Sequence, residues 1–167
     1  FQKQLLAEFF QQPAWKITML RNDVGVFTGR GGTIAFLLSK KGIAVVDSQF
    51  PDQSKHLIDE LKKQSEKPFK YLINTHHHRD HSSGNIAFKD IMEHVVGHEN
   101  CLANMKKVAE RDKTEDKQLY PDITFSDKWK KKLGGERIRN YYFGAAHTNG
   151  DAIIHFDRTR AVHPLGT

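Results

Sequence analysis

The hydrophobic and polar positions of the chain alternate with two different periods, which together predict a mixed α/β fold. Short apolar runs bounded by glycine, asparagine or aspartate are typical of strands, and apolar residues spaced three or four apart are typical of helices. We therefore expect strands at 15–20, 24–27, 34–38, 43–46, 70–73, 94–97, 123–133, 137–143 and 152–156. Helices are expected at 3–11, 52–64, 86–92 and 100–110.

The order of these elements gives a first arrangement. The first four strands follow one another with only short turns between them, which predicts an antiparallel meander. The strand at 123–133 and the strand at 137–143 should form a hairpin through Gly134 and Gly135. The charged segment 111–121 has no periodicity, so we expect a surface loop or a mobile cover there.

Composition sets the class of protein. A chain of 167 residues allows one domain, covering 1–167, with a real core. Its hydrophobic content of 38% and charged content of 28% are typical of a soluble globular protein. No apolar run reaches 18 residues, so no membrane partner is expected. Cys101 is the single cysteine, which rules out an internal disulfide and leaves the compartment open.

The charge of the chain is strongly positive, with a net charge of +6 and a pI near 9.4. Lysines are concentrated at 106–107 and 128–132. A basic surface of this kind can attract nucleic acid or an acidic substrate. The segment 128–133 is better explained as a strand with a solvated lysine face, and we favour this interpretation. Nucleic acid is therefore not an expected partner, although a pocket lined by these lysines would favour a nuclease.

One segment carries most of the chemical information. Residues 76–81 read His-His-His-Arg-Asp-His and follow the apolar run Tyr71-Leu72-Ile73. In an extended segment alternate side chains point the same way, so His76 and His78 should face one metal ion. Asp80 and His81 follow and could hold a second ion. Imidazoles mixed with one carboxylate suit zinc better than magnesium or calcium. The alternatives are a polar loop that is rich in histidine by chance, or an affinity tag, but tags are terminal.

A third ligand for the first ion should come from elsewhere in the chain, because a catalytic zinc commonly takes three protein ligands and keeps one position open. The best candidate is His147, in the segment Gly144-Ala145-Ala146-His147-Thr148-Asn149-Gly150-Asp151. This segment is rich in small residues and lies between two apolar runs. By itself His147 would be an ordinary turn histidine; beside the first motif we favour a ligand.

The two motifs together resemble the metallo-beta-lactamase fold superfamily of metallohydrolases. The likeness extends from about residue 15 to residue 156 and includes Val45-Val46-Asp47, which is similar to an apolar strand ending in aspartate in that family. It implies a four-layer αββα sandwich. It also implies that His76, His78 and His147 hold one zinc ion, that Asp80 and His81 contribute to a second, and that Asp47 orients the ligands.

Some residues depart from the family's pattern. Gln49 stands where many members have glycine, and His78 stands where an oxygen-reducing diiron branch has glutamate, which favours zinc hydrolysis. Gly166 is followed by Thr167 where the family has aspartate, and no later segment supplies a final histidine. The fold is therefore expected to be incomplete at the C-terminus. His163 could substitute as a ligand, but a surface histidine in a frayed tail is the favoured interpretation.

These observations predict a zinc-dependent hydrolase that uses a metal-bound hydroxide on an ester, amide, lactam or thioester. One or two zinc ions and a small-molecule substrate are expected, with Asp80 as the catalytic residue that orients the nucleophile. The alternative is a metal-binding but catalytically impaired fragment. A homo-oligomer stays possible. Resemblance to extracytoplasmic members slightly favours a periplasmic or secreted protein.

Overall fold

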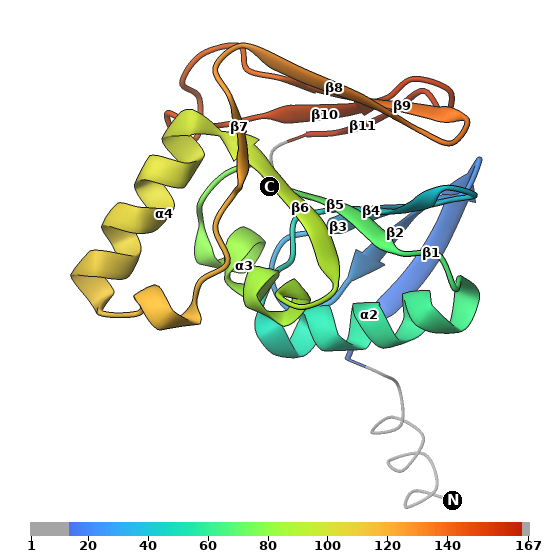
Figure 1. Cartoon of the computed structure of the whole chain (residues 1–167), viewed down its shortest axis with the longest axis horizontal. Helices are drawn as coiled ribbons and strands as arrows, with labels where there is room; N and C mark the ends of the chain where they lie inside the picture. Colours follow the sequence, from blue (N-terminus) through green and yellow to red (C-terminus); the bar gives the residue numbers. More distant parts are fainter. Residues whose placement is uncertain (1–13, 165–167) are drawn as a thin grey trace, which may run out of the picture.

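The computed structural model describes residues 14–164, so the helix expected at 3–11 and the pair Gly166-Thr167 lie outside the described residues. Figure 1 shows two β-sheets stacked face to face, with helices on the far side of the first sheet and one long helix, in yellow, along its left edge. The principal helices are α2 (Pro51–Gln64), α3 (Arg79–Ser82) and α4 (Glu99–Asp112). Within residues 14–164, no helix covers the outer face of the second sheet.

The first sheet has seven strands in the order of the sequence. Strands β1 to β4 are antiparallel, as the predicted meander requires, and β4 to β7 are parallel. The strands are β1 (Lys16–Arg21), β2 (Val24–Thr28), β3 (Ile34–Ser39), β4 (Gly42–Val46), β5 (Phe69–Ile73), β6 (Met92–His98) and β7 (Ile123–Phe125).

The second sheet has four antiparallel strands in the order β11-β10-β9-β8. Strands β8 (Lys128–Leu133) and β9 (Glu136–Tyr141) form the hairpin predicted at Gly134 and Gly135. They are followed by β10 (Ile153–Phe156) and β11 (Ala161–His163). None of the helices in the described part of the chain combines the length and apolarity that crossing a bilayer requires.

Alternating side chains of the first sheet build two separate cores. Ala44 and Val46 of β4 face the second sheet and pack with Ile138, Ile154 and Phe156. Their neighbours Ile43 and Val45 face the opposite way and pack against the helical layer, which contributes Leu57, Leu61 and Phe88. Because a strand buried on both faces has no polar side, β4 reads as the unbroken apolar run Ile-Ala-Val-Val.

The structure corrects three of the predicted elements. The strand expected at 123–133 is two strands in different sheets: β7 pairs with β6, and β8 pairs with β9 after a break at Ser126 and Asp127. The helix expected at 86–92 lies earlier, as α3 and the 3₁₀ helix η1 (Ser83–Phe88). The expected loop at 111–121 contains the short 3₁₀ helix η2 (Glu115–Lys117).

The parallel pairing of β4 and β5 brings the chemically interesting segments together. Val46 lies opposite Ile73, so the residues that follow each strand emerge at the same edge of the sheet. Asp47 follows β4 directly, and its backbone N–H donates to the Ile73 carbonyl (2.8 Å). The loop before β10 reaches the same edge, because Ala152 N–H donates to the Thr75 carbonyl (2.8 Å).

Candidate metal centre

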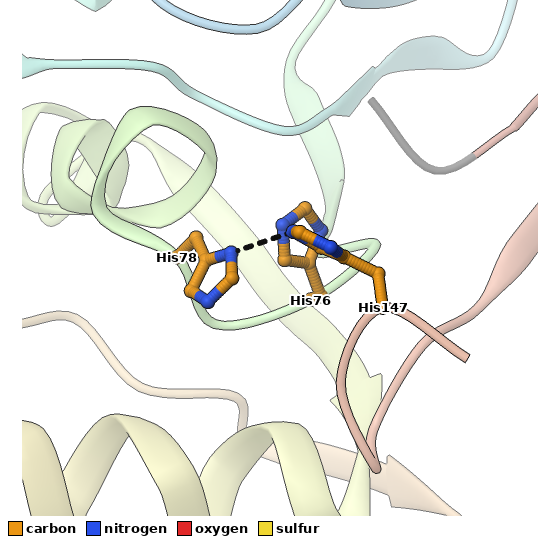
Figure 2. A group of neighbouring side chains, drawn as sticks. All are labelled: His76, His78 and His147. Carbon is orange, nitrogen blue, oxygen red and sulfur yellow. Dashed lines mark hydrogen bonds between the residues drawn. The ribbon is translucent and has the colours of Figure 1, made fainter. Parts of the chain in front are cut away.

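Three histidines from two distant segments converge at this edge. His76 and His78 lie in the extended segment after β5, and His147 lies in the loop between β9 and β10. Each offers a ring nitrogen, and these nitrogens all lie within 4.8 Å of one another. Figure 2 shows the three rings turned toward one another, with His147 Nε2 2.9 Å from His78 Nδ1. The structure thus brings together the three residues that the sequence predicted for the first ion.

A chain of hydrogen bonds behind His76 fixes which of its nitrogens carries the proton. Thr75 Oγ1 lies 2.7 Å from Asp47 Oδ2 and 2.9 Å from His76 Nδ1. The carboxylate can only accept, so the single hydroxyl proton of Thr75 points to Asp47. Thr75 Oγ1 must then accept from His76 Nδ1–H. We therefore assign the Nδ1–H tautomer to His76, which leaves the Nε2 lone pair free.

The free nitrogen of His76 is suited to a metal ion. His76 is fully buried, and its Nε2 has no hydrogen-bond partner among residues 14–164. Burial, only partly offset by the charge of Asp47, lowers the pKa of His76 to about 4, so its imidazole is neutral at pH 7. A buried acceptor without a partner is costly, and a cation removes that cost. Three imidazoles are a donor set that fits zinc, with Zn–N bonds of about 2.0–2.1 Å.

Asp80 and His81 are held differently. His81 Nδ1 lies 2.8 Å from Asp47 Oδ2, and its Nε2 lies 3.5 Å from Asp80 Oδ2. Burial opposes protonation of His81, but the hydrogen bond and the charge of Asp47 raise its pKa. Among residues 14–164, His76, His78 and His147 are the one group of three or more possible ligands whose ligand atoms all lie within 4.8 Å of one another. A second ion at Asp80 and His81 therefore stays a prediction.

Asp47 connects Thr75 and His81 through hydrogen bonds to its carboxylate. Its carboxylate is fully buried and accepts hydrogen bonds from Thr75 N–H (2.8 Å), from Thr75 Oγ1 and from His81. Although burial opposes it, the neighbouring imidazoles of His163 and His81 hold the pKa of Asp47 well below its usual range. The carboxylate is thus a fixed negative charge that holds Thr75 and His81 by hydrogen bonds.

The expectation of an exposed His163 in a frayed tail is wrong. His163 ends β11 and is only 8% exposed, because this short strand pairs with β10. Its Nε2 lies 3.8 Å from Asp47 Oδ2, which is too long for a hydrogen bond. His163 does not belong to the group of three histidines.

The turn after β4 explains the family's glycine at position 49. Gln49 has a φ of 52°, in the left-handed region that glycine adopts without strain. The side chain of Gln49 is buried and donates from Nε2 to the Gly32 carbonyl. Gly32 itself lies against the ring of His81, where an added Cβ would be 2.3 Å from Cε1. The turn at Gln49 and the segment that contains Gly32 therefore enclose His81.

Sequence reasoning assigned no role to Thr75, although it stands directly before His76. The available signal was its place at the end of an apolar strand, next to a ligand. His77, by contrast, is not part of the group of three histidines and lines a cavity of about 480 Å³ that Met105 and Val108 also line.

Comparison with known proteins gives a consistent family and fold. The sequence model of the metallo-beta-lactamase superfamily matches residues 28–163. Among solved structures, a metallo-beta-lactamase from Pontibacter korlensis is 20% identical with a TM-score of 0.71, covering 86% of this chain and 67% of its own. The metallo-beta-lactamase IND-7 is 20% identical with a TM-score of 0.72, covering 91% and 71%. BJP-1, a subclass B3 metallo-beta-lactamase of Bradyrhizobium japonicum, is 18% identical with a TM-score of 0.69, covering 84% and 56%.

Proposed function

Because the chain belongs to the metallo-beta-lactamase superfamily, we propose that it is a zinc-dependent hydrolase acting on an ester, amide, lactam or thioester bond. The observation that carries the proposal is the convergence of His76, His78 and His147 within 4.8 Å. The similar solved structures are metallo-beta-lactamases, which makes a lactam one candidate substrate.

In this proposal each residue has a separate task. His76, His78 and His147 hold the ion, and Thr75 and Asp47 keep the Nε2 lone pair of His76 turned toward it. A zinc ion held in this way would lower the pKa of a water molecule to about 7 and would polarise the substrate oxygen.

Asp80 is the proposed catalytic residue. Its side chain is 49% exposed, so its oxygens can reach solvent beside the buried His81. In our proposal Asp80 Oδ2 accepts a hydrogen bond from the attacking water and orients it toward the scissile carbonyl. The expected second ion would use the same carboxylate together with His81.

The test combines metal content with turnover. The purified chain is loaded with zinc, the metal per chain is measured by elemental analysis, and nitrocefin and a thioester are assayed. We expect at least one zinc per chain and its loss, together with turnover, in His76→Ala. His56→Ala is the matched control, because His56 is exposed on α2 and lies outside the group.

Each outcome has a distinct meaning. If His76→Ala keeps stoichiometric zinc, the metal assignment is wrong. If the wild-type chain binds zinc but turns over neither substrate, the alternative of a metal-binding, catalytically impaired chain is the better description.

A second candidate activity, hydrolysis of a phosphodiester, is favoured by one feature. A groove of about 540 Å³ is lined by a set of basic and aromatic residues, namely Lys128, Trp129, Lys130, Lys131, Lys132, Arg137, Arg139 and Tyr141. This is the lysine-lined pocket that the sequence analysis named as a sign of a nuclease. Arg139 is paired with Asp157 (2.7 Å), whereas Lys130 and Lys132 form no ion pair among the described residues.

The nuclease alternative is tested on the same protein. A single-stranded RNA oligonucleotide is offered to the zinc-loaded chain, and cleavage is followed at low and at physiological salt. A nuclease should lose cleavage in Lys130→Ala/Lys132→Ala and keep its zinc. If RNA stays intact while nitrocefin or the thioester is hydrolysed, the second candidate is refuted.

A further inference from the structure

The loop that carries His147 is closed at its base by a hydrogen bond between its two sides. Tyr142 lies just after β9, and its hydroxyl donates to the backbone carbonyl of Asn149 (3.1 Å). Thr148 N–H and Thr148 Oγ1 both donate to the Asp151 carboxylate, which stiffens the same side of the loop. His147 therefore projects from a loop whose base is fixed.

This closed base is attached to the first turns of α4. Asn100 Nδ2 donates to the Asn149 carbonyl (2.7 Å), and Asn104 Nδ2, one turn later, donates to Asn149 Oδ1 (2.6 Å). The contact is close: a Cβ added to Gly150 would lie 2.5 Å from the Cys101 backbone nitrogen. A glycine is therefore needed at 150 for the loop to approach the helix.

The other side of the loop rests on the residue that caps α4. His98 Nδ1 accepts from the Asn100 backbone N–H (3.1 Å), which caps the helix. The ring of His98 also stacks on the ring of Tyr142, with centroids 3.9 Å apart and an angle of 24° between the planes. One end of α4 thus holds both sides of the loop.

Beyond this base the loop makes few contacts. His147 is exposed, and its ring is hydrogen-bonded to His78. A Cβ added to Gly144 would meet no atom within 4 Å. Apart from its bond to His78, the His147 imidazole is therefore positioned by the base of the loop.

We propose that His98, Asn100 and Asn104 at the start of α4 are positioning residues that place His147 for metal binding by holding Asn149 and Tyr142. This inference rests on the proposed metal site. If these residues position His147, polar groups that do not contact the ion control the affinity of the site for the metal, as residues behind metal ligands commonly do. A purely structural attachment would instead change the stability of the chain and leave the metal site as it is.

The test titrates the metal-free chain with zinc and with cobalt(II), which reports ligand geometry through its visible absorption bands. We expect Asn104→Ala and Asn149→Ala each to lower the affinity for both ions about fivefold, which corresponds to the loss of one hydrogen bond. Both substitutions should also change the cobalt absorption bands. Asn100→Ala/Asn104→Ala should weaken binding about 10- to 30-fold. Lys107→Ala, on an exposed position of α4, is the matched control and should bind like the wild type.

A conservative variant separates positioning from a general loss of structure. Asn149→Asp keeps an oxygen that accepts from Asn104, so it should bind both ions at least as well as the wild type, with unchanged cobalt bands. The melting temperatures of the metal-free variants are measured alongside. Asn149 is exposed, so its variants should fold even if Asn104→Ala is destabilised.

Two results would overturn the positioning role: wild-type affinity and bands in both Asn104→Ala and Asn149→Ala, or equal weakening in Asn149→Asp and Asn149→Ala. Failure of the proposed function looks different. In that case the wild-type chain takes up no cobalt, or His147→Ala takes it up as well as the wild type does, and the positioning role falls with it.

Discussion

Replacing Thr75 by valine should uncouple His76 from Asp47 while keeping the shape of the side chain. Thr75 is fully buried, and its hydroxyl makes two hydrogen bonds, to Asp47 Oδ2 (2.7 Å) and with His76 Nδ1 (2.9 Å). Valine removes both bonds and leaves the Nδ1–H of His76 without an acceptor. The metal-free chain should therefore lose about 1–3 kcal/mol of its free energy of unfolding, since each net bond contributes roughly 0.5–1.5 kcal/mol.

The effect on metal binding should be larger than the loss of two bonds suggests. Without Thr75 Oγ1 the proton of His76 is free to move to Nε2, the nitrogen that faces the other histidines, and there it competes with the ion. We expect zinc affinity to fall about 10- to 100-fold, the usual consequence of removing a partner behind a metal ligand.

The assay is zinc titration against a chelator of known affinity, with denaturant unfolding of the metal-free protein beside it. Thr75→Ser is the matched control, because it keeps the hydroxyl and should bind zinc nearly as the wild type does. If Thr75→Val binds zinc as tightly as Thr75→Ser, the hydroxyl does not set the tautomer of His76 and the reasoning fails.

Three further predictions concern the same region. In the metal-free chain at pH 6, nitrogen-detected NMR should find His76 neutral, because burial lowers its pKa to about 4. His81 should be protonated, because its hydrogen bond with Asp47 and the charge of Asp47 outweigh burial and raise its pKa. A protonated His76 beside a neutral His81 would contradict both pKa shifts. Gly32→Ala should cost about 1–3 kcal/mol in urea unfolding, because the added methyl overlaps the ring of His81, and an unchanged stability would show that the ring moves aside freely. Cys101 should react with an aromatic disulfide reagent only after denaturation, since burial raises its thiol pKa and encloses the sulfur; rapid labelling of the native chain would refute this.

The sequence alone determined the existence of most elements and the identity of the three converging histidines. Strands β2, β3, β4 and β5 lie where the apolar runs predicted them, because strands buried on both faces leave a continuous apolar signal. His76 and His78 were predictable because alternate residues of an extended segment share one side. His147 was predictable only because the motif at 76–81 requires a further ligand and because His147 lies between two apolar runs.

The tertiary structure decided what depends on contacts between distant segments. It placed residues 123–125 and 128–133 in different sheets, although their sequence reads as one strand. It buried His163 against Asp47 by pairing β11 with β10, where the end of the chain had suggested a frayed tail.

The proposed roles of Thr75 and of the asparagines on α4 also depend on contacts between distant segments. Thr75 acquires its role because parallel pairing of β4 and β5 sets Asp47 beside it. Asn104 acquires its proposed role because the loop before β10 returns to α4, 45 residues away along the chain. Local periodicity records which side of its own strand or helix a residue occupies, whereas a hydrogen-bond partner is fixed only when the chain has closed on itself.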